Sequence, residues 1–213
     1  DDITQSVTAA IEPKLVAAEG ARSRSRSPQD LSAWELVARA MEHYGRMATS
    51  ESETAIKLLR SAVQRHPDYG PAHSLLAFAL LVSGYQGWIP DSDDYSEAAE
   101  LARRAEQLDN EDPWAHLALG YLALTNGRTE EAIRACKKAL ELNPNFATAL
   151  GLLGRTLAFD GQFDEAIPYW ELALRLSPHD PMKAFFYAGM CSGHYMAFRY
   201  DEAVEWGRKA TME

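Results

Sequence analysis

Cysteine is scarce in this sequence, with two among 213 residues, Cys136 and Cys191. Small domains held together by disulfides need many more, so a disulfide framework is disfavoured. Both cysteines fall in stretches with helical periodicity, at positions expected to face the interior. This usage favours a reducing compartment, and we expect the protein to be cytoplasmic.

Long apolar runs are also missing. No segment approaches the roughly 20 consecutive apolar residues that cross a bilayer as a helix, and the first residues show no signal-peptide pattern. The sequence therefore predicts no membrane insertion. It opens with Asp1-Asp2-Ile3, without an initiator methionine, and stops inside a helical pattern at Glu213, so we interpret it as an excised piece of a longer protein.

Basic residues are outnumbered. The 21 Lys and Arg stand against 31 Asp and Glu, which gives a formal net charge of -10 and a pI near 5.1. Proteins that bind nucleic acid gain much of their affinity by neutralising phosphates. We therefore expect no nucleic-acid partner.

Residues that carry chemistry form no recognisable constellation. No His or Cys pair has zinc spacing, no glycine-rich phosphate loop precedes a helix, and no serine lies in a nucleophile elbow. His73 and His116 occupy equivalent interior positions, which indicates packing. The acidic run from Asp91 to Glu97 lacks the central glycine and terminal glutamate of a calcium loop. We predict no catalytic residue, no metal site and no cofactor.

A repeat organises the middle of the chain. Ala132, Ala139 and Pro144 recur 34 positions later as Ala166, Ala173 and Pro178, and Leu119-Gly120 and Gly127 recur at the same distance. A period of this length, with small residues where helices must touch, is typical of stacked helical hairpins. Helices are expected near Pro113–Thr125, Thr129–Leu142, Phe146–Phe159 and Phe163–Leu176.

The remaining chain is divided around this repeat. We expect an N-terminal helical segment over residues 1–21, a flexible linker over 22–30, and an array over 31–213, in units of about 31–68, 69–110, 111–144, 145–178 and 180–213. The first unit is irregular, and a shifted register places Trp34, Val37, Met41 and Tyr44 on one buried stripe. The second unit contains an extra rim loop in which Trp88 and Ile89 either fold back on the helices or form a contact surface.

The motif Gly-x-Phe-x-Glu-Ala at Gly161–Ala166, with Pro178 twelve residues after the alanine, resembles the tetratricopeptide repeat. The stretch from Gly127 to Pro144 is similar to it. The resemblance covers residues 31–213 and implies an all-α fold, a right-handed α-solenoid (superhelix) of about five helical hairpins behind the N-terminal segment.

A shorter resemblance concerns the start of the chain. The similarity lies in Asp1-Asp2-Ile3-Thr4, in Ala10-Ile11-Glu12-Pro13, in the basic linker and in Ala33-Trp34-Glu35-Leu36. These residues are similar to the segment that joins an upstream domain to such arrays in bacterial signalling proteins. Those proteins resemble class III adenylate/guanylate cyclases or winged-helix regulators with a TolB-like domain. The implied setting is a larger bacterial signalling protein.

The tetratricopeptide resemblance also implies a concave groove lined by the first helix of each hairpin. The implied ligand-binding residues are Trp34, Met41, Tyr44, Ser74, Phe78, Leu81, Trp114, Leu117, Tyr121, Arg155, Phe185, Ser192 and Tyr195, with Val37, Leu124 and Thr148 beside them. Such a stripe suits a peptide with apolar side chains and one carboxylate for Arg155. Alternatively, several of these rings pack between adjacent helices. Tyr121 and Arg155 are expected to line the groove because neither is a comfortable core residue.

The carboxylate clamp that the family uses for heat-shock chaperones is absent, because Leu117, Tyr121, Gly151 and Leu152 stand where polar groups are needed. We expect a non-catalytic scaffold that binds a protein or peptide, as the interaction region of a signalling protein. Two alternatives stay open: the regulatory part of a nucleotide cyclase whose catalytic domain lies elsewhere, and a homodimerisation module. The groove could also be filled by the N-terminal segment or by a second copy of the chain.

Overall fold

The structure is a computed structural model that describes Ala18 and residues 31–46, 48–89, 95–178, 180 and 182–212. Over these residues the chain is helical, with turns and short connections but no strand. The predicted N-terminal segment and linker, apart from Ala18, lie outside the described residues, as do Asp91, Asp93 and Asp94. The expected all-α architecture is confirmed for the part of the chain that is described.

The helices come in successive pairs. Their bounds are α2 (Ala33–Tyr44), α3 (Thr49–Arg65), α4 (Gly70–Tyr85), α5 (Ser96–Leu108), α6 (Pro113–Thr125), α7 (Thr129–Leu142), α8 (Ala147–Phe159), α9 (Phe163–Leu176), α10 (Lys183–Met196) and α11 (Tyr200–Met212). Three of the four helices expected in the regular units have the predicted bounds, and the fourth, α8, begins one residue later than predicted.

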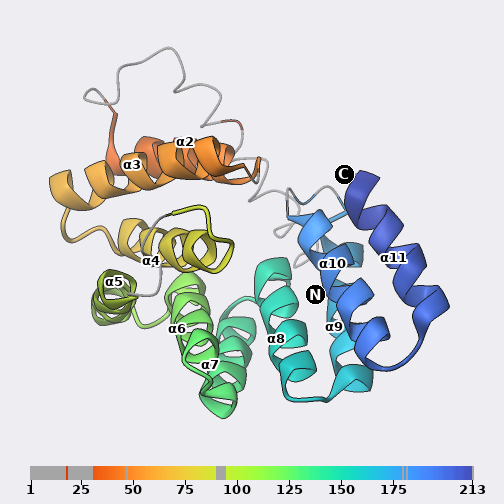
Figure 1. Cartoon of the computed structure of the whole chain (residues 1–213). Helices are drawn as coiled ribbons and strands as arrows, with labels where there is room; N and C mark the ends of the chain where they lie inside the picture. Colours follow the sequence, from red (N-terminus) through yellow and green to blue (C-terminus); the bar gives the residue numbers. More distant parts are fainter. Residues whose placement is uncertain are drawn as a thin grey trace.

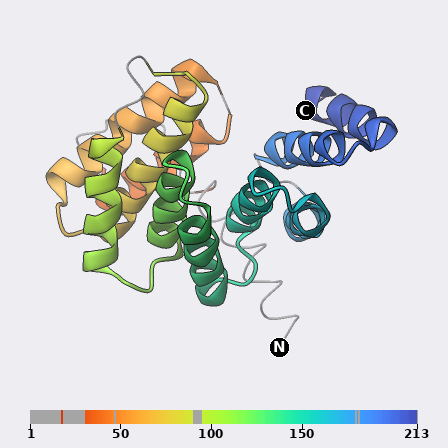
Figure 2. The same cartoon turned by 60° about the horizontal axis from the view of Figure 1, so that its bottom comes forward.

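The pairs follow one another along a curve (Figures 1 and 2). Within each pair the two helices pack together, and α4, α6, α8 and α10 also pack against the second helix of the preceding pair. Contact between first helices joins α2 to α4, α4 to α6, α6 to α8 and α8 to α10. In Figure 1 the helices α4, α6, α8 and α10 lie on the inner side of the curve.

The first helix of each regular pair is almost free of charge. Helices α4 and α6 contain no Asp, Glu, Lys or Arg, and α8 contains Arg155 alone. A helix that is apolar all round must be covered on all sides. Each of these helices is covered by two second helices and by the neighbouring first helices. Arg155 is the exception, because it is a charged residue on a helix that is otherwise apolar and covered.

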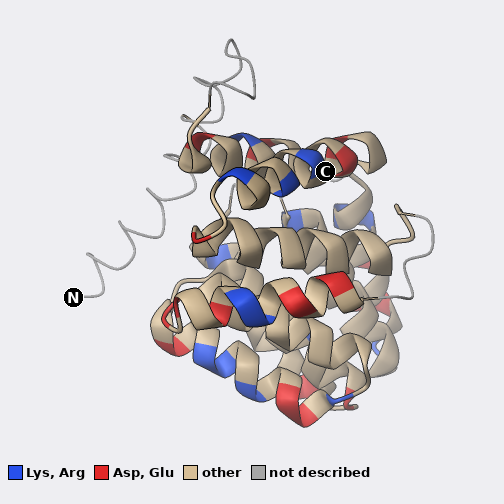
Figure 3. Cartoon of the chain, turned by 90° about the vertical axis from the view of Figure 1, so that its left-hand side faces the viewer, with Lys and Arg blue, Asp and Glu red and all other residues tan. Residues whose placement is uncertain are grey.

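The second helices carry the charge. Figure 3 shows Lys and Arg interspersed with Asp and Glu over the face turned to the viewer. Some pairs join neighbouring units, including Arg60 with Glu97 at 2.7 Å and Arg104 with Asp68 at 3.0 Å. These side chains are exposed, so each pair contributes about 1 kcal/mol or less. Among the described residues, no helix is both long and apolar enough to span a membrane.

Trp170 fixes the spacing of α8, α9 and α10. It comes from α9, is 2% exposed, and its indole nitrogen donates to the carbonyl of Gly151 at 3.0 Å. A Cβ atom added at Gly154 would lie 2.9 Å from an atom of the Trp170 ring. The corresponding distances are 2.6 Å for Gly189 and 2.8 Å for Gly193. The indole therefore fills a slot between α8 and α10 that exists because these positions lack side chains.

His73 and His116 play the same part in successive units. Each is buried near the start of its helix, with Nε2 2.8 Å from a carbonyl oxygen in the preceding turn, that of Pro67 or that of Asn110. In both cases the contact spans six residues of the chain. Both histidines thus have the packing role expected from their equivalent positions, and each ties a turn to the following helix.

The first unit differs from its predicted stripe. The buried residues of α2 are Leu36, Val37, Ala38, Ala40 and Tyr44, whereas Trp34 is 43% exposed and Met41 is half-buried. The register is set by the capping box of Ser32 and Glu35, which begins the helix at Ala33. In the rim loop, Ile89 packs against the core and Trp88 is half-buried, so the described part of the loop folds back on the helices.

We predict that Gly189→Ala destabilises the protein by about 1–3 kcal/mol, because the new methyl group would overlap a buried ring that cannot move away. Urea unfolding followed by circular dichroism measures the change. Gly70→Ala is the control: outside its chain neighbours its Cβ would have its nearest atom at 3.6 Å, an ordinary contact, so it displaces no buried ring, and the cost expected of it is the smaller one of placing alanine before Pro71. If the two variants were equally stable, the claim that the Trp170 ring fills the space at Gly189 would be wrong.

We also predict that Cys136 resists thiol reagents in the folded protein. Burial raises the pKa of this thiol to about 12, and the thiolate is the reactive form. Titration with a disulfide reagent near neutral pH should modify Cys191, which is half-buried, and reach Cys136 after unfolding. Rapid labelling of a Cys191→Ala variant under native conditions would refute this.

Candidate functional site

Aromatic rings connect the first helices on the inner side. Phe78 of α4 contacts the rings of Tyr44, Trp114 and Tyr121, at centroid distances of 5.9, 5.3 and 6.0 Å. Tyr121 also meets Tyr85 at 6.2 Å. All four contacts are edge-on, the arrangement that places the positive edge of one ring on the negative face of another. The rings therefore form a continuous inner aromatic cluster from α2 to α6.

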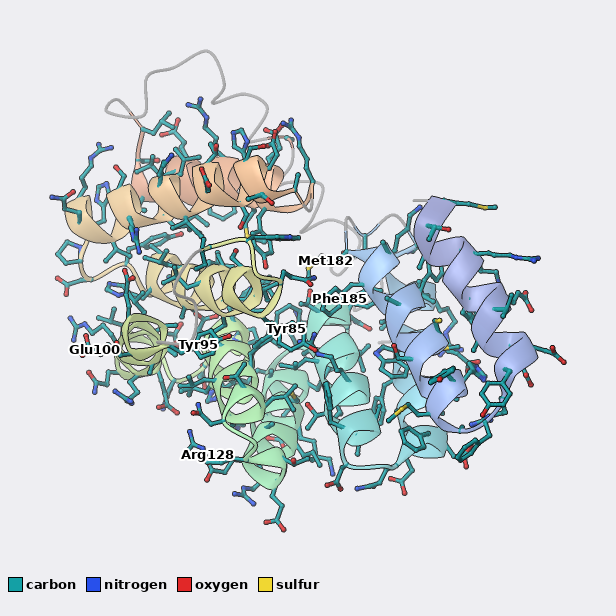
Figure 4. The ribbon with its side chains drawn as sticks, viewed as in Figure 1. Tyr85, Tyr95, Glu100, Arg128, Met182 and Phe185 are labelled. Carbon is teal, nitrogen blue, oxygen red and sulfur yellow. The ribbon has the colours of Figure 1, made fainter. Side chains whose placement is uncertain are left out.

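Arg155 joins this cluster to α10. Its guanidinium carbon lies 4.7 Å from the ring centroid of Tyr85, 4.7 Å from that of Tyr121 and 4.8 Å from that of Phe185. Each distance is within the range of a cation–π interaction. Figure 4 shows Tyr85 and Phe185 facing the same space between α4 and α10. We call Arg155 and these three rings the Arg155 site.

Several polar atoms of this region are buried without a hydrogen-bond partner. They are Nε and Nη2 of Arg155 and the hydroxyls of Tyr44 and Tyr121. Burial raises the pKa of Tyr121, with Arg155 acting in the opposite direction. Burial raises the pKa of Tyr44 as well, and neighbouring Tyr121 adds to this increase. A buried donor that lacks an acceptor costs free energy, so two nitrogens of this guanidinium keep unused hydrogen-bonding capacity.

A small cavity adjoins the site. Its volume is about 10 Å³, room for about one water molecule. Phe78, Tyr121, Gly151, Arg155 and Phe185 are among the residues that line it. The side chain of Arg155 is half-buried and that of Tyr85 is 47% exposed. The site is therefore closed at its base and partly open beside Tyr85.

Many residues of the predicted groove lie between helices. Ser74, Leu81 and Leu117 are 0% exposed, Phe78 and Tyr121 are 2% exposed, and Tyr44 is 3% exposed. Trp114 and Phe185 are half-buried, with Met41, Thr148 and Leu124, while Ser192 is exposed. The expectation that Tyr121 lines an open groove is wrong for this structure, because neighbouring rings and Arg155 cover its phenol. These buried residues offer no surface to a ligand in this conformation.

Two of the predicted residues outside the Arg155 site are exposed aromatic residues. Trp34 is 43% exposed on α2. Tyr195 is 60% exposed and its ring contacts Tyr200 at the turn between α10 and α11. Sequence reasoning missed Tyr85, which completes the Arg155 site. It follows Phe78 and Leu81 at helical spacing on the same face of α4, so extending that stripe by one turn would have found it.

The chemistry open to this site is recognition of an anion or an acceptor group. The site brings together one guanidinium and three aromatic rings. Among the described residues, no group of three or more His, Cys, Asp or Glu could hold a metal ion. Arginine in such a setting suits a carboxylate, which accepts two parallel N–H bonds.

We predict different effects on stability for two replacements of Tyr121. Tyr121→Ala should cost about 3–5 kcal/mol of stability, because it removes a buried ring and leaves a cavity. Tyr121→Phe should leave stability unchanged or slightly higher, because the hydroxyl that it removes is buried without a partner. Chemical unfolding at neutral pH measures both. A loss of about 1 kcal/mol or more in Tyr121→Phe would show that the hydroxyl has a partner.

The pH dependence is a second readout of this prediction. The pKa of Tyr121 is raised above its ordinary value of 10.0 in the folded chain, so above about pH 10 the unfolded chain releases this proton and the folded chain keeps it. Stability then falls as pH rises through this window. Tyr121→Phe should reduce that fall relative to the unchanged chain.

Comparison with known proteins places these helices in a family. Residues 91–145 and 117–181 match the family model described as tetratricopeptide repeat. The chain is 29% identical over 138 residues to "Putative adenylate cyclase 3" of Rhizobium meliloti (strain 1021), covering 63% of this chain and 23% of that protein. It is 34% identical over 104 residues to "Photosystem I assembly protein Ycf3" of Synechococcus sp. (strain CC9605), covering 40% of this chain and 59% of that one.

The fold is also found in solved structures. A thermophilic tetratricopeptide repeat protein of Thermus thermophilus superposes with a TM-score of 0.66 at 19% identity, over 84% of this chain and 90% of that one. At this identity the likeness concerns the fold alone. The chain spans less than two thirds of the length of the curated relatives that it matches. The two matches to the family model together span residues 91–181, and the described helix pairs share the fold of a solved tetratricopeptide repeat protein, so the chain contains a tetratricopeptide repeat region.

Proposed function

We propose that this chain is a non-catalytic scaffold that binds a peptide segment of another protein on the inner side of its curve. One observation carries the proposal: Arg155 is the only charged residue of α8, it is stacked among three rings, and two of its nitrogens are buried without an acceptor. A cation placed in this way gains most from a ligand that brings an acceptor with a negative charge.

The ligand would contact the site through two kinds of group. A carboxylate, from an Asp or Glu side chain or a chain end, would approach the guanidinium of Arg155. An apolar side chain of the ligand would pack on Tyr85 and Phe185, which are exposed and half-buried, respectively. Aromatic and arginine side chains are the residue types that dominate binding energy in protein interfaces.

The small cavity sets how the ligand would enter. Room for about one water molecule does not admit a carboxylate beneath the rings. The ligand would therefore meet the outer edge of the Arg155 site, with the partly exposed ring of Tyr85 turning aside. Rotation of an exposed side chain is fast and needs no change in the packed helices.

Similarity to the relative named as a cyclase favours a second candidate. The match covers 23% of that protein, so the corresponding region accompanies a much larger remainder. On this reading the chain is the cytoplasmic regulatory part of a bacterial nucleotide cyclase whose catalytic domain lies outside these residues. Cyclase assays on the complete protein and on residues 1–213 would separate the two readings, because activity in the complete protein alone supports the second.

A peptide array tests the proposed scaffold. We expect peptides retained by residues 1–213 to share an acidic residue, or a free carboxyl end, next to an aliphatic or aromatic residue. Arg155→Gln should weaken binding of the retained peptides by about tenfold or more, measured by fluorescence anisotropy. Amidation of the carboxyl end, or exchange of the acid for its amide, should weaken binding to a similar extent.

Arg128→Leu is the matched control, because it removes an exposed arginine that pairs with Glu131 at a hairpin turn. It should leave peptide affinity unchanged. Equal binding to the unchanged protein and to Arg155→Gln would overturn the proposal. Sedimentation analysis would reveal the remaining alternative, a stable homodimer in which a second copy covers the inner side.

A further inference from the structure

The turn between α10 and α11 contains a strained aromatic residue. Phe198 has a φ of 61°, and it is the one non-glycine residue with positive φ among those that the structure describes. At the same place in the preceding turns stand Gly87, Gly127 and Gly161, with φ of 68°, 69° and 79°. Bulky side chains disfavour this conformation, which glycine adopts freely.

The equivalence of these positions rests on hydrogen bonds. In the turns at Gly127, Gly161 and Phe198, the residue's own N–H donates to the carbonyl three residues earlier, and the next N–H donates to the carbonyl five residues before it. In each case the second helix begins two residues after the positive φ. The backbone of the last turn is thus the same as in the others, and glycine would suit it better than phenylalanine.

Packing does not explain the phenylalanine. Phe198 is 78% exposed, with Tyr195 at 60% and Tyr200 at 53%. Their rings contact one another, with Tyr200 lying 5.7 Å from Tyr195 and 6.3 Å from Phe198. We call these three residues the turn patch. It combines an unfavourable backbone with exposed apolar area, and contiguous exposed aromatics mark contact surfaces.

Carboxylates border the turn patch. Asp201 and Glu202 follow Tyr200 in the first turn of α11, and Asp164 and Glu165 occupy the first turn of α9. Arg199 joins the two turns, with its Nη2 2.6 Å from Asp164 Oδ1, so its charge is already paired. The basic residues of the two helices that flank the patch, Lys183, Arg208 and Lys209, stand nearer the opposite ends of those helices. The border is therefore acidic.

We propose that the turn patch binds a basic amphipathic segment of a partner protein, at a surface separate from the Arg155 site. The partner's apolar side chains would cover the three rings, and its Lys or Arg residues would meet Glu165, Asp201 and Glu202, since Asp164 is already paired with Arg199. Basic side chains also suit exposed aromatic faces. A second copy of the chain is a poorer occupant, because a symmetric contact would bring two acidic borders together in a chain with a net charge of -10.

Fluorescence anisotropy with two designed peptides tests this inference. Each peptide is a labelled helix of about 18 residues, with leucines on one face and either lysines or glutamates on the other. The lysine peptide should bind residues 1–213, less tightly at high salt, and about tenfold or more tighter than the glutamate peptide. Phe198→Gly should weaken binding of the lysine peptide by about tenfold or more.

Phe198→Gly separates binding from folding, because glycine relieves the disfavoured backbone, and its thermal midpoint should not fall below that of the unchanged protein. Met212→Ser is the matched control: it removes an 83% exposed apolar side chain at the far end of α11 and should leave binding unchanged. The inference would be overturned if the lysine peptide did not bind, or if Phe198→Gly bound it as tightly as the unchanged protein. It would also be overturned if the glutamate peptide bound as tightly as the lysine peptide. If the protein self-associated and Phe198→Gly abolished this, the inference would also be overturned, because the turn patch would then bind a second copy of the chain.

Discussion

The insertion of Trp170 between α8 and α10 determines how the C-terminal half of the array is built. The indole is buried, bonded to the carbonyl of Gly151 and enclosed by positions where a Cβ would overlap it. Interiors are packed as densely as organic crystals, so a ring of this size fixes the separation of the helices around it. The same close approach lets Phe186 of α10 occupy the space above Gly151, where a Cβ would lie 2.5 Å from its ring.

The Arg155 site depends on that spacing. Phe185 precedes Phe186 on α10, and it reaches the guanidinium because α10 is held against α8. Tyr85 and Tyr121 reach it from α4 and α6, whose rings are already joined. Four helices from successive units therefore supply one cation and its three rings. Such a site forms only when neighbouring units stack, which couples the candidate binding surface to the integrity of the array.

The two candidate surfaces differ in how much their side chains contribute to the stability of the fold. At the Arg155 site, aromatic rings also contribute to the core, so their removal changes stability and binding together. At the turn patch, the rings are exposed and Phe198 opposes the preferred backbone. Natural sequences usually agree with their local structure, and departures are concentrated where function requires them. The second surface is therefore the one that mutation can test without disturbing the fold.

The sequence by itself determined the helical pairs, their period and most of their bounds, because apolar spacing, turn glycines and closing prolines act locally. It also placed Arg155 on a face shared with aromatic residues. The tertiary structure decided which rings became core and which stayed accessible. Periodicity identifies a face of a helix, but whether that face meets solvent or another helix depends on contacts between units. For this reason Leu81, Leu117 and Tyr121 proved buried, Trp34 proved exposed, and Tyr85 joined the site unpredicted.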